Sequence, residues 1–298
     1  PRLANTRRYL LFPKGEKFET ADNDSVDRVE TRFAGATWRK VVHKLESHWR
    51  YGLLALAGLL FILWAGMSYG IPWLAKTIAY RLPTSILNFA GHQTLDMLDR
   101  SIFEPSILDE KTRKRLLEHF QSVLVTHTDD GLAIVFRKGG KIGPNAFALP
   151  SGTIVFTDEM IQVAEHDDEL SAVLLHEIGH IANRHGMRSL IQDSLLGFVL
   201  LAMTGDVSGS SELFLGLPVL LTELAYSRKF EREADAYALT AMQDHGISPV
   251  HFASLMRRID NQQPHVSDKT SEKWINYLST HPLTEERLKE FERELSNG

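Results

Sequence analysis

The sequence predicts an α+β fold that is mainly helical, in which one transmembrane helix precedes a domain with a small β-sheet beside a central helix. Three observations support this prediction. Residues 51–75 contain no charged side chain, residues 132–136 and 153–156 are short apolar runs rich in β-branched residues, and residues 167–180 place apolar or small residues at helical spacing. A chain of 298 residues leaves about 220 residues after the uncharged run, enough for one domain with a full core.

The uncharged run divides the chain into three parts. Residues 12–20 indicate the end of a small β-rich unit, so residues 1–50 are expected to be an N-terminal cytoplasmic segment that ends a truncated small domain. Residues 51–75 are the expected span, and residues 76–298 are the expected second domain. Basic residues are more frequent before the run than directly after it, which predicts that the N-terminal side stays in the cytoplasm. They are Arg39, Lys40, Lys44 and Arg50 before it, and Lys76 and Arg81 after it.

The run is longer than the roughly 20 apolar residues that cross a bilayer. Aromatic side chains lie near its two ends, at Trp49, Tyr51, Tyr69 and Trp73, as is typical of membrane interfaces. A buried helix of a soluble domain is the alternative, but such helices are rarely this long and free of charge. The run therefore predicts a single-pass membrane protein with lipid as a partner.

A His-Glu-Ile-Gly-His run that begins at His176 predicts a zinc site. On an α-helix, residues four apart lie on one face, so His176 and His180 can offer two imidazole nitrogens to the same ion. Glu177 then lies beside the remaining position, where it can accept a proton from an attacking water molecule and pass it to the leaving amine. Asp167 and Asp168 suit the N-terminal cap and first turn of this helix. A chance match is the alternative interpretation of the five residues alone.

A catalytic zinc site normally has three protein ligands, so a third ligand is expected elsewhere in the chain. The pattern with a third histidine six residues after the second is absent, because that position is Gly186. Downstream, Glu231 and Asp235 are four residues apart in a segment with a helical pattern. In this interpretation Glu231 binds the ion and Asp235 hydrogen-bonds one of the imidazoles that bind it. Glu233 is a rival ligand, and a solvated Glu-rich helix is the alternative; only the four-residue spacing favours Glu231.

These motifs resemble those of the gluzincin-type membrane zinc metalloproteases, the family of HtpX, the CAAX prenyl proteases, the mitochondrial Oma-type proteases and BepA. The resemblance covers roughly the last two-thirds of the chain. Its matching stretches are residues 145–152, 176–185, 227–235 and 279–282. One departure is Ser151, where the family often has the first Gly of a Gly-Gly pair; it affects the expected turn geometry and not the chemistry.

The resemblance implies a zincin-like metalloprotease domain with one Zn²⁺ per chain, held by His176, His180 and Glu231. It also places His281, which precedes a proline, near the active site. There His281 is expected either to stabilise the oxyanion or to occupy the fourth zinc position in a resting state. From the residues alone, a histidine at a helix start is more often a capping or packing residue.

The resemblance further implies a bacterial inner-membrane protein whose protease domain faces the periplasm and acts on misfolded or misassembled envelope proteins. The apolar runs at residues 132–136 and 153–156 predict a strand pair. An exposed edge of this sheet, within residues 145–157, could pair with an extended substrate. A purely structural sheet is the alternative, and the resemblance favours the substrate role.

Other features carry weaker interpretations. Arg228 is a candidate for substrate contact or an ordinary salt bridge, and Arg184 and His185 are expected to tie the end of the zinc helix to the core. Residues 195–203 and 213–221 are apolar but too short to span a bilayer; they are interpreted as core helices, with a mobile lid as the alternative. Residues 94–126 carry helical periodicity and are expected to lead into the domain.

Composition excludes several classes of function. A net charge of −5 and the lack of a basic patch give no reason to expect nucleic acid. The chain has no cysteine, which excludes thiolate zinc ligands and disulfides. The sequence therefore predicts a membrane-anchored zinc endopeptidase with protein or peptide substrates. A catalytically weak adaptor that binds client strands is the alternative, against which Glu177 argues; a zinc hydrolase of a non-protein amide is a third interpretation. The sequence leaves the oligomeric state open.

Overall fold

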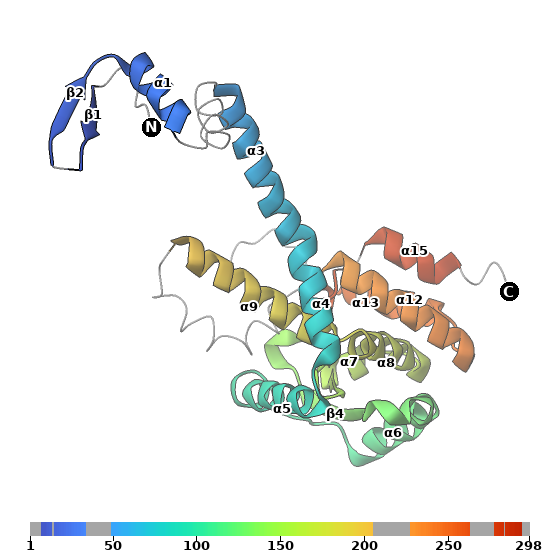
Figure 1. Ribbon diagram of the computed structural model, residues 1–298. Coiled ribbons are helices and arrows are strands. Elements are labelled where there is room, and N and C mark those ends of the chain that lie inside the picture. The colour runs from blue at the N-terminus through green and yellow to red at the C-terminus, as the bar shows by residue number, and fades with distance from the viewer. Residues whose placement is uncertain are drawn as a thin grey trace, which may run out of the picture. The chain divides into compact units, whose positions relative to one another are not determined.

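The computed structural model describes residues 7–13, 15–33, 49–204, 227–262, 277–282 and 284–293 of the chain, and Figure 1 shows its helices and strands. Two compact units are present, Pro1–Ser68 and Tyr69–Gly298. In the first unit, β1 (Arg8–Leu11) and β2 (Lys17–Thr20) form an antiparallel hairpin, which agrees with the β-structure expected near residues 12–20. Helices α1 (Asn23–Phe33) and α3 (Trp49–Ala65) follow in the chain.

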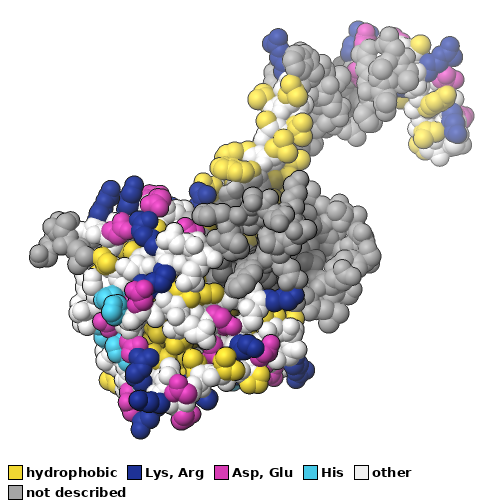
Figure 2. Space-filling view, turned by 180° about the vertical axis from the view of Figure 1, so that it is seen from behind, with side chains coloured by type: hydrophobic (Ala, Val, Ile, Leu, Met, Phe, Trp, Pro, Cys, Tyr) yellow, Lys and Arg dark blue, Asp and Glu magenta, His cyan; other side chains and the backbone are white. Residues whose placement is uncertain are grey.

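Helix α3 is apolar around its whole circumference. Its large hydrophobic side chains from Leu53 to Trp64 are exposed, and Figure 2 shows hydrophobic side chains along its surface. A π-helical turn, η1 (Gly66–Gly70), and α4 (Ile71–Arg81) follow in the chain. Among the described residues, one helix is long and apolar enough to cross a membrane, Gly52–Arg81, with a mean hydropathy of 1.9 and none of its most apolar window buried. The expected apolar helix is therefore present as a candidate span.

The second unit contains a four-stranded sheet with the order β3-β4-β6-β5. Its strands are β3 (Glu104–Pro105), β4 (Ala133–Lys138), β5 (Ala146–Ala148) and β6 (Thr153–Thr157). The two apolar runs of the sequence form the neighbouring strands β4 and β6, as predicted, and they pair in parallel. Strands β3 and β5 pair antiparallel with β4 and β6 respectively, so β5 is an edge strand.

Helices pack on both faces of this sheet. Alternate residues of a strand point to opposite faces, so neighbouring residues of β6 contact different helices. Ile154 and Phe156 of β6 join the core that contains helix α6 (Glu110–Leu124), whereas Val155 joins Leu98 of helix α5 (Thr84–Ser101) in a second cluster. Helices α5 and α6 account for most of the helical periodicity expected at residues 94–126. The structure confirms a mainly helical α+β unit with a small sheet.

Helix α8 (Asp167–Ala182) is the central helix of the second unit, and its residues 169–180 are all buried. It packs against strand β5 and helices α12 (Arg228–His245) and α13 (Val250–Asn261). The N-cap is His166, so Asp167 and Asp168 lie in the first turn, where carboxylates favour the positive end of the helix. Glu169 is buried and accepts two hydrogen bonds from Arg258, at 2.9 and 3.0 Å.

Helix α9 (His185–Thr204) begins after a sharp change of direction at Arg184, whose φ is 51°. The Arg184 guanidinium donates to the carbonyl oxygens of Ala79 (2.5 Å) and Leu82 (3.1 Å) at the end of α4. This contact agrees with the structural role expected of Arg184. The apolar residues 195–203 lie in α9, and residues 213–221 lie outside the described residues. The interpretation of both segments as core helices therefore stays a prediction, as does the mobile lid.

The remaining elements complete the second unit (Figure 1). They are the short helix α7 (Asp158–Val163) after β6, the 3₁₀ helices η2 (Val125–Asp130) and η3 (Gly140–Ile142), and the C-terminal helices α14 (Tyr277–Thr280) and α15 (Glu285–Arg293). The backbone N–H of Tyr277 donates to the carbonyl oxygen of Pro144, 3.0 Å away. This bond holds the start of α14 beside the start of β5.

Candidate metal centre

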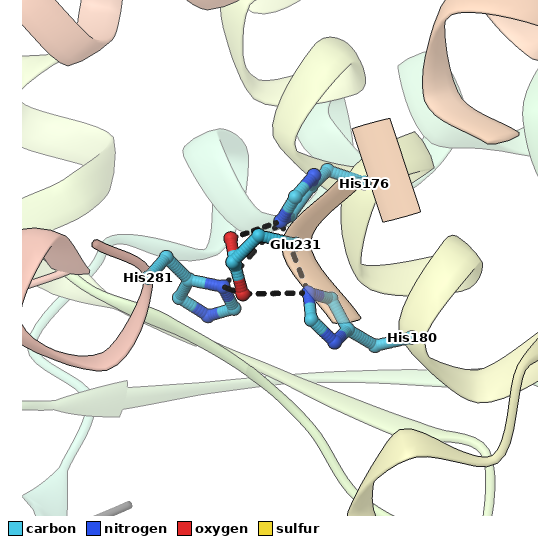
Figure 3. A group of neighbouring side chains, drawn as sticks. All are labelled: His176, His180, Glu231 and His281. Carbon is cyan, nitrogen blue, oxygen red and sulfur yellow. Dashed lines mark hydrogen bonds and ion pairs between the residues drawn. The ribbon is translucent and has the colours of Figure 1, made fainter. Parts of the chain in front are cut away.

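Four side chains from three separate parts of the chain converge in the core of the second unit (Figure 3). His176 and His180 come from α8, Glu231 comes from the first turn of α12, and His281 follows α14. All four are 0–2% exposed. Each offers one ligand atom, and these four atoms lie within 4.8 Å of one another. No other such group occurs in the part of the chain that the structure describes.

Several distances between these side chains are close to those between the ligand atoms of a tetrahedral ion. Ligand atoms bound at about 2.0–2.1 Å around a tetrahedral zinc lie about 3.3–3.4 Å from one another. His180 Nε2 is 3.1 Å from His176 Nε2 and 3.4 Å from Glu231 Oε1, and His176 Nε2 is 3.5 Å from Glu231 Oε2. His281 Nδ1 is 3.4 Å from His176 Nε2 and 3.1 Å from Glu231 Oε1. The donor set of three imidazoles and one carboxylate also suits zinc.

A glycine allows α8 and α12 to approach each other closely. A Cβ atom added at Gly179 of α8 would lie 3.0 Å from the carbonyl oxygen of Ala234 and 3.2 Å from Cβ of Tyr237 on α12. Most side chains at this position would therefore push α12 away from α8. The close approach lets Glu231 reach the two histidines of α8.

Asp235 and Arg287 contact two of the four converging side chains, His176 and Glu231. Asp235 Oδ1 lies 3.1 Å from His176 Nδ1, the nitrogen that faces away from the centre. Arg287 donates to both carboxylate oxygens of Asp235, at 2.6 and 2.8 Å, and lies 2.9 Å from Glu231 Oε2. The four-residue spacing of Glu231 and Asp235 thus brings both carboxylates to His176, in the arrangement expected from the sequence.

Glu233, the rival ligand, lies elsewhere. Its Oε2 is 3.0 Å from His185 Nε2 and 2.5 Å from Arg188 of α9. The other ring nitrogen of His185 is 3.0 Å from His180 Nδ1. Glu233 therefore reaches the centre only through a second imidazole. Arg228 is exposed at the start of α12.

Glu177 lies directly beside the four converging side chains. The hydroxyl of Tyr277 donates to Glu177 Oε1 over 3.1 Å, and His281 Nε2 is 3.5 Å from the same oxygen. Within the described residues, no hydrogen-bond partner reaches the buried Glu177 Oε2. The rings of Tyr277 and His281 are stacked, with centroids 4.3 Å apart. One carboxylate oxygen of Glu177 is thus held in place and the other is available.

The electrostatic environment attracts positive charge. Burial lowers the pKa of His176, but its contacts with Asp235 and Glu231 outweigh burial and raise that pKa to about 9. Burial also raises the pKa of Glu231, but the neighbouring histidines hold it well below its usual range. The carboxylates of Glu177, Glu231 and Asp235 share this buried volume with one guanidinium, that of Arg287. A divalent cation would balance this charge, so the residues present fit a zinc ion in both geometry and charge.

A pocket of about 560 Å³ opens beside His180. Its lining includes residues from the start of α5 and from the turn between β5 and β6. A Cβ added at Gly91 of α5 would lie 2.3 Å from Oγ of Ser151, so helix and turn are in tight contact there. The pocket offers space for part of a ligand next to His180.

Sequence reasoning missed two residues of this centre, Tyr277 and Arg287. Tyr277 stands four residues before His281, at the spacing of one helical turn, which is a usable but weak signal. Arg287 lies in a polar helix with several charged residues, and its spacing from them gives no signal that separates it from the other basic residues. Each approaches the centre only because distant parts of the chain fold together.

Comparison with known proteins agrees with this arrangement. A metalloendopeptidase of Schizosaccharomyces pombe, mitochondrial OMA1, is 31% identical over 151 residues, which are 50% of this chain and 43% of that protein. The beta-barrel assembly-enhancing protease of Escherichia coli (strain K12) is 27% identical over 154 residues, 48% of this chain and 31% of that protein. A protease HtpX homolog of Halobacterium salinarum is 33% identical over 153 residues, 45% of this chain and 51% of that protein.

The chain thus matches about a third to a half of the length of these relatives. A family model, described as peptidase family M48, matches residues 111–295. This match spans strands β4, β5 and β6, the helices α8 and α12 and the C-terminal segment with His281 and Arg287. The chain belongs to peptidase family M48.

Proposed function

We propose that the protein is a membrane-anchored, zinc-dependent endopeptidase. The observation that carries this proposal is the convergence of His176, His180 and Glu231 beside the available oxygen of Glu177. In the proposal the two histidines and Glu231 hold one Zn²⁺. The ion would act as a Lewis acid that polarises the substrate carbonyl and makes water acidic enough to react at neutral pH. Glu177 acts as general base and then as general acid.

The protein side chains around Glu177 support this assignment. Tyr277 fixes one carboxylate oxygen of Glu177, so the other can take a proton from water and return it to the leaving nitrogen. Asp235, held by Arg287, orients the ring of His176 so that Nε2 faces the centre. The general base and one proposed ligand, His176, are thereby each fixed by a partner from another element.

The outer edge of β5 is the proposed site for an extended peptide. The backbone carbonyl of Asn145 accepts from the N–H of Thr157 (3.0 Å), and the N–H of Leu149 donates to the carbonyl of Thr153 (2.8 Å). The backbone N–H and C=O groups of the odd-numbered residues therefore point toward β6. In an antiparallel pair the residues between them turn their backbone groups the other way. The N–H and C=O of Ala148 therefore point to the open edge, beside α8. A peptide that pairs there would pass over the proposed metal centre.

His281 is proposed to fill the fourth position in the closed arrangement that the structure describes. Its Nδ1 lies at ligand-to-ligand spacing from His176 and Glu231, and Glu177 is 0% exposed. Substrate entry would then require the segment that contains α14 to move. In His281→Ala, a gain in activity supports this role. A loss of activity with zinc retained supports stabilisation of the oxyanion instead, and no change dismisses both roles.

The proposed anchor is the helix Gly52–Arg81, crossing the bacterial inner membrane once with residues 76–298 on the periplasmic side. The basic residues before the helix support this orientation. The proposed substrates are misfolded or misassembled envelope proteins, by analogy with relatives named as beta-barrel assembly-enhancing proteases. An alkaline phosphatase fusion after residue 90 tests the orientation, because it is active only if that position is periplasmic.

The test of the central proposal compares the detergent-purified protein with Glu177→Gln, measuring bound zinc and cleavage of unfolded casein. We expect about one zinc in both and cleavage by the parent alone. If both bind zinc and neither cleaves, the protein is latent or binds client strands without turnover. If the parent binds no zinc, the proposal is wrong.

A further inference from the structure

We propose that His185, backed by Glu233 and Arg188, is a positioning residue that presents Nε2 of His180 to the metal. The inference rests on the zinc site of the proposed function and extends it to residues of helix α9. His185 and Glu233 each had another expected role from the sequence, as a structural residue and as a rival ligand. In the structure they belong to one chain of contacts that ends at a proposed metal ligand.

The order of donors and acceptors along this chain follows from its two ends. A carboxylate can only accept, and Glu233 Oε2 accepts from Arg188 over 2.5 Å, so the facing nitrogen of His185, Nε2, carries the hydrogen. Both imidazoles are at most 1% exposed, which favours their neutral forms. A neutral His185 with hydrogen on Nε2 has a lone pair on Nδ1.

That lone pair faces Nδ1 of His180 at 3.0 Å. His180 must therefore carry its hydrogen on Nδ1, which leaves the lone pair of His180 on Nε2. Nε2 is the atom that lies 3.1 Å from His176 Nε2 and 3.4 Å from Glu231 Oε1, at the centre of the cluster. The chain from Arg188 to His180 thus selects the tautomer that can bind a metal.

The two ligand histidines of α8 are consequently oriented by different devices. His176 faces a carboxylate directly, that of Asp235, whereas His180 faces a carboxylate through an intervening imidazole. The ring of His185 is held by stacking on the ring of Phe230, with centroids 4.4 Å apart and planes 6° apart. The guanidinium of Arg188 lies 4.3 Å from the centroid of the Phe230 ring. His185 and Arg188 lie in the first turn of α9, so the position of this helix against α8 and α12 helps to determine the tautomer of His180.

The test measures zinc affinity of the full chain in detergent, by competition with a chromophoric chelator, together with the melting temperature of the metal-free protein. His185→Leu removes Nδ1, the acceptor that faces His180, and fills the position with an apolar side chain of similar length. We expect its zinc dissociation constant to rise roughly 10–100-fold, the usual cost of losing a partner of a ligating histidine. His185→Asn offers a carbonyl oxygen to His180 Nδ1 and should recover part of the loss.

Glu233 provides a second pair of variants in case His185→Leu does not fold. Glu233→Gln keeps a carbonyl acceptor for His185 and should bind zinc nearly as tightly as the parent, whereas Glu233→Met should bind it more weakly. The matched control is Glu169→Met, which breaks another buried pair of carboxylate and arginine at the N-terminal end of α8, the helix that carries His180. It should lower the melting temperature and leave the zinc affinity unchanged.

The outcomes separate the inference from the proposed function. If the parent binds zinc and His185→Leu and Glu233→Met bind it equally tightly, His185 only packs the core and the inference is wrong. If the Leu and Asn variants of His185 lose affinity equally, acceptance from His180 is not the cause and the inference is also wrong. If the parent itself binds no zinc, the proposed function fails first.

Discussion

Helices α3 and α8 are both rich in apolar residues, yet they differ in the exposure of their side chains. The described side chains of α3 within its apolar window are exposed, whereas α8 is buried from Glu169 to His180. The buried helix is the one that carries polar and charged side chains: its Glu169, His176, Glu177 and His180 each have a partner from another element. The exposed helix carries no charge between Gly52 and Ala65. A protein interior can hold polar side chains when each of them has a partner. An apolar helix with exposed side chains is stable only when another apolar phase or surface covers it.

Zinc removal should have the largest effect on the proposed peptidase activity, and its effect on stability should be confined to the unit of α8. We expect a chelator to abolish peptide cleavage and to lower the melting temperature by roughly 5–10 °C, since zinc at 100 times its dissociation constant contributes about 2.7 kcal/mol. Scanning calorimetry and the casein assay check this, and added zinc should restore both. Fractionation with membranes should not change; a chelator-induced release from membranes would contradict the separation of the two regions.

Charge introduced into α3 should have the next largest effect. Leu56 and Ile62 are 51% and 68% exposed, and replacing both by Lys should cost roughly 5–7 kcal/mol of membrane insertion, at about 2.5–3.5 kcal/mol for each charge. Carbonate extraction should then find the double variant in the soluble fraction, and the double Ala variant should stay in the pellet. Membrane retention of the Lys variant would show that α3 is not surrounded by lipid.

Arg287→Met tests whether the charges around α8 require their partners. The change leaves Asp235 and Glu231 without the guanidinium that contacts both. We expect a loss of about 3–5 kcal/mol of unfolding free energy, the usual cost of removing one partner from a buried ion pair. Urea denaturation of the zinc-loaded protein measures it. Arg257→Met removes an exposed pair with Glu292 and should cost at most about 1 kcal/mol; equal costs would contradict this reasoning.

The smallest effect is expected at the other end of α8 and depends on pH. Burial raises the pKa of Glu169, but hydrogen bonds from Arg258 and from the backbone of Glu165 outweigh burial and hold that pKa below its usual range. A lowered pKa means that the folded state favours the charged carboxyl. The stabilisation is thus fully present above the unfolded value of about 4.3 and is lost as pH falls through the folded value.

Glu169→Gln should therefore be less stable than the parent at pH 7, and the difference should shrink below about pH 4.3. Urea midpoints between pH 7 and pH 3 measure this. Glu110→Gln, at a side chain that is 86% exposed, provides the control and should follow the parent throughout. A difference between Glu169→Gln and the parent that is independent of pH would indicate lost packing alone.

Local spacing explains which parts of the centre could be predicted. His176 and His180, and likewise Glu231 and Asp235, are each four apart on one helix, so the sequence itself places each pair on one face. Glu231 and Glu233 are two apart and lie on different sides of α12, so only one can face α8. Which one does so depends on how α12 packs, and the structure shows Glu231 toward α8 and Glu233 toward α9.

Contacts between distant segments could not be predicted. Tyr277 is 100 residues from Glu177 in the chain, and no periodicity links a C-terminal residue to a central helix. The parallel pairing of β4 and β6 was missed for a similar reason: alternation of apolar residues identifies strands but does not give their relative direction. His185 was assigned to the core correctly, but its hydrogen-bond partners depend on where α9 and α12 meet.

Gly179 changes how much information the His-Glu-Ile-Gly-His run contains. The two residues between Glu177 and His180 are usually treated as unspecified, because neither offers a ligand. In this chain the second of them faces Ala234 at a distance where a Cβ is barely accommodated, so its identity encodes the separation of two helices. A search pattern that restricts this position to small residues would select chains whose helices can meet as α8 and α12 do, and would discard chance matches that the ligands alone retain.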